Sequence, residues 1–227
     1  QIQEVFKSPI VTSLAITLEK YNLDDLYILQ KFKTKIRKVS VHGTEDPVVR
    51  LFYLSKIITL KIESFGIEIV ITKLLGSQIN FQELLQNLAK ANPKKLSFRF
   101  RIGAMGNKES LEVVNYYLKP LTILPKLNLS LTLAQIEDLD LFIPELTDIT
   151  TNLKGIEMLE LVINYSLRPL SNPMQLLLKS LKDKYSLRKL TIRLKRGNAA
   201  TNRLNDSVYN YLSHLMFLQE VRLDDLQ

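Results

Sequence analysis

Apolar residues recur along the chain in one short pattern: an apolar residue, two free positions, a second apolar residue, one free position and a third apolar residue. The pattern occurs eight times, and its copies begin at Val11, Ile36, Ile57, Pro93, Leu124, Ile156, Leu187 and Leu218. Successive copies start 25, 21, 36, 31, 32, 31 and 31 residues apart. A period of this size is typical of proteins built from stacked structural repeats, which bind partners more often than they catalyse reactions.

Polar and apolar residues alternate around each copy of the pattern. In one such stretch Leu96, Phe98 and Phe100 alternate with Ser97 and Arg99. A period of two predicts β-strands that bury one face and leave the other in water. The sequence therefore predicts about eight strands, one for each copy.

Amphipathic helical spacing appears between the predicted strands. It predicts five helices, at residues 23–29, 81–88, 111–118, 174–181 and 208–215. We expect prolines to separate these elements or to begin them, namely Pro47, Pro93, Pro144 and Pro173. No Gly/Ser-rich or Pro-rich linker divides the chain, so we expect a single domain over residues 1–227.

Strand-then-helix units fit an open solenoid, a doubly wound sheet or an eight-stranded barrel. The last two bury both faces of a parallel sheet, so their strands tend to be continuously apolar. Charged residues such as Lys61, Glu63 and Arg193 stand at outward positions of the predicted strands. Unpaired charges are costly inside a barrel, and this pattern favours the open solenoid.

Apolar residues at relative positions one, four and six resemble the leucine-rich repeat, from Val11 to Leu223. The resemblance implies an α/β solenoid, or horseshoe, of about eight irregular repeats, with a concave parallel sheet and outer helices. This family carries Asn or Cys three places after the third apolar residue, and here that residue is present only as Asn164. We therefore expect the turns to satisfy their backbone groups without an asparagine ladder.

Repeats of about 31 residues with helices and few ladder asparagines look most like the irregular ribonuclease-inhibitor-like and F-box-associated type. That resemblance implies a protein-binding module, either for substrate recognition in an F-box-like adaptor of a ubiquitin ligase or for scaffolding. No F-box segment is recognisable in the 227 residues, so the likeness is one of architecture.

The composition limits the class of protein and its cellular location. The chain is 46% apolar and 24% charged, as in folded proteins, and no apolar run reaches the length of a membrane span. It has no cysteine, which rules out disulfides and thiol catalysis and favours a cytoplasmic or nuclear location. Because it begins at Gln1 rather than Met, we expect a fragment of a longer protein.

Catalytic and metal-binding motifs are missing from the sequence. It contains no Gly-x-Ser-x-Gly motif, phosphate loop or dinucleotide fingerprint. Its two histidines, His42 and His214, lie far apart. We therefore expect no enzyme, no catalytic residue, no cofactor and no metal site.

The basic residues are the strongest indication of a binding function in the sequence. The net charge is +8, and two predicted strands carry alternating cations, Arg99 with Arg101 and Arg193 with Lys195. Such rows could bind phosphates or an acidic peptide, although a solvated, solubilising surface explains them equally well. Glu160 and Glu63 are expected to weaken their field.

Outward positions of the strands are the predicted contact surface for a partner protein. The candidates are Ser40, His42, Lys61, Glu63, Arg99, Arg101, Asn128, Ser130, Glu160, Arg193, Lys195 and Arg222. The alternatives are a nucleic-acid-associated subunit that uses the basic strands and, third, an enzyme built on an α/β barrel. The sequence predicts no membrane association and leaves the oligomeric state open.

Overall fold

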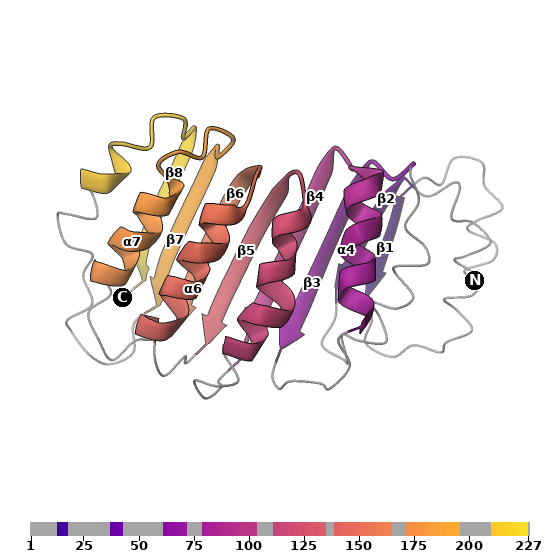
Figure 1. Ribbon diagram of the computed structural model, residues 1–227, viewed down its shortest axis with the longest axis horizontal. Helices are drawn as coiled ribbons and strands as arrows, with labels where there is room; N and C mark the ends of the chain where they lie inside the picture. The colour runs from indigo at the N-terminus through magenta and orange to yellow at the C-terminus, as the bar shows by residue number, and fades with distance from the viewer. Residues whose placement is uncertain are drawn as a thin grey trace.

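A computed structural model describes most of the chain. The described residues are 13–17, 37–42, 61–71, 79–103, 111–134, 139–164, 171–195 and 210–226. The helix predicted at 23–29 and the proline at 47 lie outside these ranges. Within them the protein is α/β, with a single all-parallel sheet and a few helices (Figure 1).

Eight strands form this sheet in the order in which they occur along the chain. They are β1 (Ser13–Thr17), β2 (Lys38–His42), β3 (Ser64–Ile71), β4 (Lys95–Ile102), β5 (Leu127–Ala134), β6 (Ile156–Asn164), β7 (Lys189–Lys195) and β8 (Glu220–Leu226). The order ends at β1 and β8, which lie toward opposite ends of the molecule (Figure 1). The sheet is therefore open, and the barrel considered as the third alternative is wrong.

Helices lie along one face of the sheet (Figure 1). They are α4 (Ile79–Ala91), α6 (Leu139–Asn152) and α7 (Ser171–Leu181), together with a π-helical turn, η1 (Val114–Leu118), and a 3₁₀ turn, η2 (Lys119–Ile123). None of the helices in the described part of the chain has both the length and the apolar character to cross a bilayer.

The hydrophobic core lies between the sheet and these helices. Strand β3 alternates strictly, with Phe65, Ile67 and Ile69 buried and the residues between them partly exposed. Its apolar side belongs to the same core as Leu84 and Leu88 of α4. The predicted strand alternation is confirmed here, and it gives the sheet one buried face and one open face.

Aromatic rings fill the core under the first half of the sheet. The ring of Phe81 on α4 lies edge-on to that of Phe98, with centroids 6.1 Å apart, and 5.4 Å from that of Tyr117. Phe98 and Phe100 are stacked at 6.0 Å. Because such rings each bury a large area, they fix α4 and η1 against β4.

One predicted strand is wrongly placed. The pattern copy at Ile57 implies a strand near 57–62, but β3 begins at Ser64. The residues that continue the repeat are Ile62, Phe65 and Ile67, and Phe65 pairs with Leu96 of β4. The corrected copy starts 26 residues after Ile36 and 31 residues before Pro93, so the repeat is more regular than predicted.

The amphipathic spacing of the sequence predicts no helix where α6 lies. Pro144 was expected between elements or at a start, but it lies inside α6. Proline in a helix interior removes one backbone hydrogen bond. A proline in the sequence therefore indicates a boundary between elements more often than the inside of a helix. The predicted helix at 111–118 is present only in part, since its second half is the π-helical turn η1.

A register shift separates β5 from β6. Leu127 pairs with Ile156 and the next residue, Asn128, pairs with Met158, so Glu157 is an extra residue in β6. An inserted residue of this kind is a β-bulge. Across the bulge the pairing separation between β5 and β6 changes from 29 residues, between Leu127 and Ile156, to 30 residues, between Asn128 and Met158.

Hydrogen bonds join neighbouring repeats in the turns where the strands begin. The N–H of Leu127 donates to the carbonyl of Gly155 at 2.8 Å, and the N–H of Arg188 donates to that of Glu157 at 2.8 Å. The ammonium of Lys184 donates to the carbonyl of Leu153 at 2.8 Å. These bonds satisfy backbone groups of the turns that precede β5, β6 and β7.

Candidate functional site

Side chains on the open face of the sheet form rows that cross the strands. The first, which we call the small-residue row, pairs Ser40, Gly66, Ser97 and Asn128 on β2 to β5. Parallel strands lie about 4.8 Å apart, so these four residues follow one another closely across the sheet. Because their side chains are short, the surface is recessed along this row.

Two charged rows run beside the small-residue row. The second row contains, in order of pairing, Glu68, Arg99, Ser130, Glu160, Thr191 and Arg222. The third row contains Val70, Arg101, Thr132, Val162 and Arg193. Acidic and basic residues are interspersed in the second row.

Eight of the twelve predicted contact residues occupy these three rows. They are Ser40, Arg99, Arg101, Asn128, Ser130, Glu160, Arg193 and Arg222. His42 and Lys195 belong to β2 and β7, but their side chains lie outside what the structure describes.

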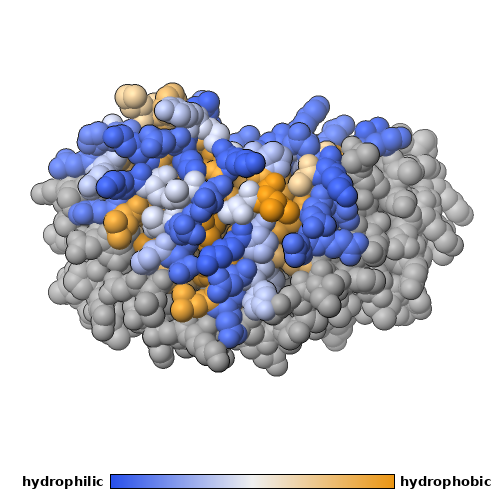
Figure 2. Space-filling view, in the orientation of Figure 1, coloured by the Kyte–Doolittle hydropathy of each residue, from blue (hydrophilic) through white to orange (hydrophobic). Residues whose placement is uncertain are grey.

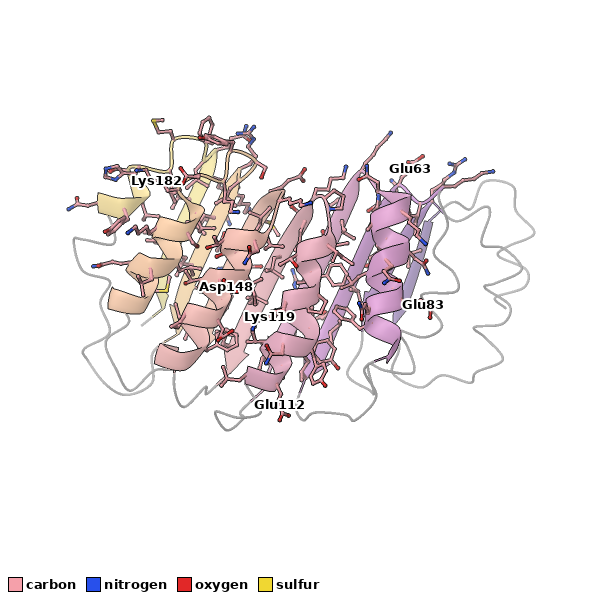
Figure 3. The ribbon with its side chains drawn as sticks, in the orientation of Figure 1. Glu63, Glu83, Glu112, Lys119, Asp148 and Lys182 are labelled. Atoms are coloured by element: carbon pink, nitrogen blue, oxygen red, sulfur yellow. The ribbon has the colours of Figure 1, made fainter. Side chains whose placement is uncertain are left out.

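Lys61 and Glu63 are not on the sheet, because β3 begins after them. Both side chains are exposed, and Glu63 lies at the end of the sheet where the strands begin (Figure 3). Its carboxylate is 4.0 Å from the guanidinium of Arg37. The prediction that they are outward strand residues is therefore wrong, and it followed from the misplaced strand.

Carboxylates neutralise part of the basic strands. The Nε of Arg101 lies 2.5 Å from a carboxylate oxygen of Glu68, and Arg193 lies 3.6 Å from Glu160. The other oxygen of Glu160 accepts a hydrogen bond of 2.8 Å from the hydroxyl of Ser130. Ser130 is only 4% exposed, so its hydroxyl holds Glu160 in place and offers little area for a partner.

The C-terminal part of the face carries a further cluster of ion pairs. Glu220 lies 3.0 Å from the ammonium of Lys189 and 2.6 Å from the guanidinium of Arg222. The hydrogen bond from Lys189 lowers the pKa of Glu220, and the charge of Arg222 acts in the same direction while burial opposes it. Glu220 is therefore held ionised on strand β8.

A groove of about 560 Å³ lies over the small-residue row. Lys38, Lys95 and Arg99 line it together with the four residues of that row, and all three of these cations are exposed. Lys38 and Lys95 flank Ser64 on the neighbouring strands. The volume of the groove is in the range of ligand-binding sites.

Sequence reasoning missed several residues of this groove. Lys38, Lys95 and Ser97 alternate with buried residues and could have been assigned to the open face by the same rule as Arg99. Glu68 could not, because the pattern copy that predicts its strand begins at Ile57, five residues before the correct copy at Ile62.

The helix-covered face is different in character. Figure 2 shows this side, where hydrophilic side chains predominate and apolar ones are scattered between them. Figure 3 places Glu83, Lys119 and Asp148 on the helical side of the molecule. Lys119 pairs there with Glu145 at 3.1 Å.

Groups that could hold a metal are also missing from the described part of the chain, where no three His, Asp or Glu residues gather. Comparison of the sequence with protein-family models and with curated proteins finds no match. The function must therefore be inferred from the open face of the sheet itself.

Proposed function

We propose that the chain is a leucine-rich-repeat-like horseshoe that acts as a protein-interaction module and binds its partner over the open face of the sheet. Two features support this fold: the strands follow one another in sequence order, and the helices share one side. The corrected period of 31 residues between Ile62 and Pro93 supports it further.

The observation that carries the proposal is the contrast between the two faces of the sheet. Most of the apolar residues are directed toward the helices, while the rows on the open face consist mainly of polar and charged residues. A sheet that leaves one face in water over this many strands offers an extended surface for a partner. Substrate recognition in an F-box-like adaptor and scaffolding in a larger assembly both use such a surface.

A protein partner is favoured over a nucleic acid by the ion pairs on this face. Arg101 and Arg193 each lie against a carboxylate. Phosphate binding depends on accumulated positive charge, and these carboxylates reduce it. Interspersed charges of both signs are instead suited to complementary contacts with another protein.

Affinity capture with surface variants tests the proposal. The tagged chain is used to capture proteins from an extract, in parallel with Asn128→Tyr and Arg222→Glu on the open face and Gln86→Tyr on α4. We expect proteins captured by the unaltered chain to be lost with the two open-face variants. They should be retained with Gln86→Tyr, which makes the same bulk change on the helix side.

Equal capture by all four proteins would contradict the proposal, because the open face would then be irrelevant to binding. Circular dichroism of each variant establishes that it is folded before the comparison is made.

A further inference from the structure

We propose that the groove over the small-residue row binds an extended acidic segment of a partner protein. This inference rests on the proposed function, because it names the chemistry of the partner that the open face would bind. It concerns one part of that face, the groove formed by β2 to β5.

Three cations around the groove have no carboxylate partner among the described residues. They are Lys38, Lys95 and Arg99, and none of them takes part in an ion pair formed within the described ranges. The acidic residue of the lining, Glu68, lies against Arg101 instead. The field in the groove is therefore positive, although the charges of the whole face are mixed.

The floor of the groove suits a peptide backbone. Ser40, Ser97 and Asn128 provide hydroxyl and amide groups, and Gly66 between them has no side chain. Short polar groups can hydrogen-bond the N–H and C=O of a chain laid over them. A segment crossing from β2 to β5 spans about 14 Å, which is about four residues in an extended conformation.

The positions of the cations specify where the acidic residues should be. Lys38 and Lys95 are two strands apart in register, a separation of about 10 Å. It matches carboxylates three residues apart in an extended peptide of the polyproline II type, in which every third side chain lies on the same side. Arg99 is four residues further along β4 than Lys95, on the other bank of the groove. We therefore expect two carboxylates at the lysine bank and a third near Arg99.

Single-stranded nucleic acid fits the groove less well. Binding of bases uses exposed aromatic rings as stacking platforms. The aromatic residues of the lining are Phe65 and Phe98, which are 0% and 1% exposed and turn into the core. The positive groove without a stacking surface favours an acidic peptide.

Fluorescence anisotropy with the full chain tests the inference. The probe is a labelled Gly/Ser peptide of roughly ten residues with Glu at every third position, a spacing that follows from the strand separation. The comparison probes are the same peptide with Gln in place of Glu, and labelled oligothymidylate of similar charge. We expect the Glu peptide to bind more tightly than both.

Charge reversal identifies the site. Lys38→Glu and Lys95→Glu should each weaken binding of the Glu peptide about five- to tenfold, as expected for reversing one charge contact at a partly exposed surface. Lys182→Glu is the matched control, because it makes the same change at an exposed lysine beyond the end of α7 (Figure 3). It should leave the affinity unchanged.

A variant without a charge change tests the groove itself. Ser97→Tyr fills the floor of the groove and should abolish binding of the Glu peptide while the chain remains folded. The inference is overturned if the Glu peptide does not bind, if Ser97→Tyr and the two lysine variants bind it as well as the unaltered chain, or if oligothymidylate binds more tightly through the same lysines.

Failure of this inference is distinguishable from failure of the proposed function. If partner capture depends on Asn128 and Arg222 but the Glu peptide does not bind, the open face is a binding surface and the acidic chemistry is wrong. If capture of the partner does not depend on Asn128 or on Arg222, the proposed function itself is wrong.

Discussion

Gly155 accepts a hydrogen bond of 2.8 Å from the backbone N–H of Leu127 on the neighbouring strand. The same close approach leaves no room for a side chain, because a Cβ on Gly155 would collide with the carbonyl oxygen of Pro125. Backbone atoms cannot move aside as the end of a flexible side chain can. The junction of β5 and β6 therefore requires glycine here.

Gly155→Ala should destabilise the protein by about 1–3 kcal/mol, the range for overpacking a close contact. Chemical denaturation of the variant and the unaltered chain measures the difference. Gly66→Ala is the matched control, because a Cβ there meets only the hydroxyl of Ser40 at 3.8 Å. That variant should be neutral or slightly stabilising, since alanine lowers the entropy of the unfolded chain. Similar losses for both would contradict this explanation.

Lys184 ties the end of α6 to the turn before β7. Its ammonium donates to the carbonyl of Thr151 at 2.6 Å and to that of Leu153 at 2.8 Å. Lys184→Met keeps most of the aliphatic chain and removes both bonds, so we expect a loss of about 1–2 kcal/mol in the free energy of unfolding. Lys182→Met, at an exposed neighbour, should cost much less.

The contribution of Lys184 to the stability of the fold should depend on pH. Burial lowers its pKa below the ordinary value of 10.5, against the opposing effect of Asp183. A lysine whose pKa is lower in the folded chain binds fewer protons when folded, so stability rises with pH between the lowered pKa and 10.5. The stability difference between the unaltered chain and Lys184→Met should therefore increase toward pH 10.5, as measured by denaturation across that range. A decreasing difference would show that the carbonyl contacts, and not burial, dominate.

How far the sequence predicts this fold depends on how uniquely its apolar residues define each strand. Leu96 and Phe98 admit one register, and β4 lies where it was predicted. Ile62 instead belongs to two overlapping patterns, one beginning at Ile57 and one continuing to Phe65. Only pairing with β4 decides between them, and such pairing is a long-range contact that periodicity does not contain.

The same limit applies to the candidate site. Alternation alone places Arg99 and Arg101 on the open face, and the structure agrees. That Arg101 lies against Glu68 depends on the register of two strands whose residues are far apart in the sequence. The charge balance of the groove therefore follows from the sheet pairing, which the sequence pattern alone does not give.

Glu220 should titrate below its ordinary value of 4.5, because its carboxylate accepts a hydrogen bond from Lys189. A carboxyl group whose pKa is lowered on folding stabilises the fold above its unfolded pKa, and this contribution is lost as the pH falls through the lowered value. Lys189→Met should raise the pKa of Glu220 more than Arg222→Met does, since the bond from Lys189 is the larger cause. The carboxyl chemical shift of Glu220, followed by NMR against pH, measures both; a larger effect of Arg222→Met would reverse the assignment.

Ser130 and Glu160 should be energetically coupled across β5 and β6. Their hydrogen bond of 2.8 Å joins a buried hydroxyl to a carboxylate that also faces Arg193. We expect Ser130→Ala and Glu160→Gln to be non-additive by about 1 kcal/mol, in the range for a hydrogen bond to a charged group that retains some access to water. Denaturation of both single variants and the double variant gives this energy. Ser130→Ala combined with Arg222→Ala is the control, because three strand separations, about 14 Å, divide these residues. Additivity in the first pair would show that the hydrogen bond between Ser130 and Glu160 does not couple β5 to β6, and the position of Glu160 would then be set by its strand alone.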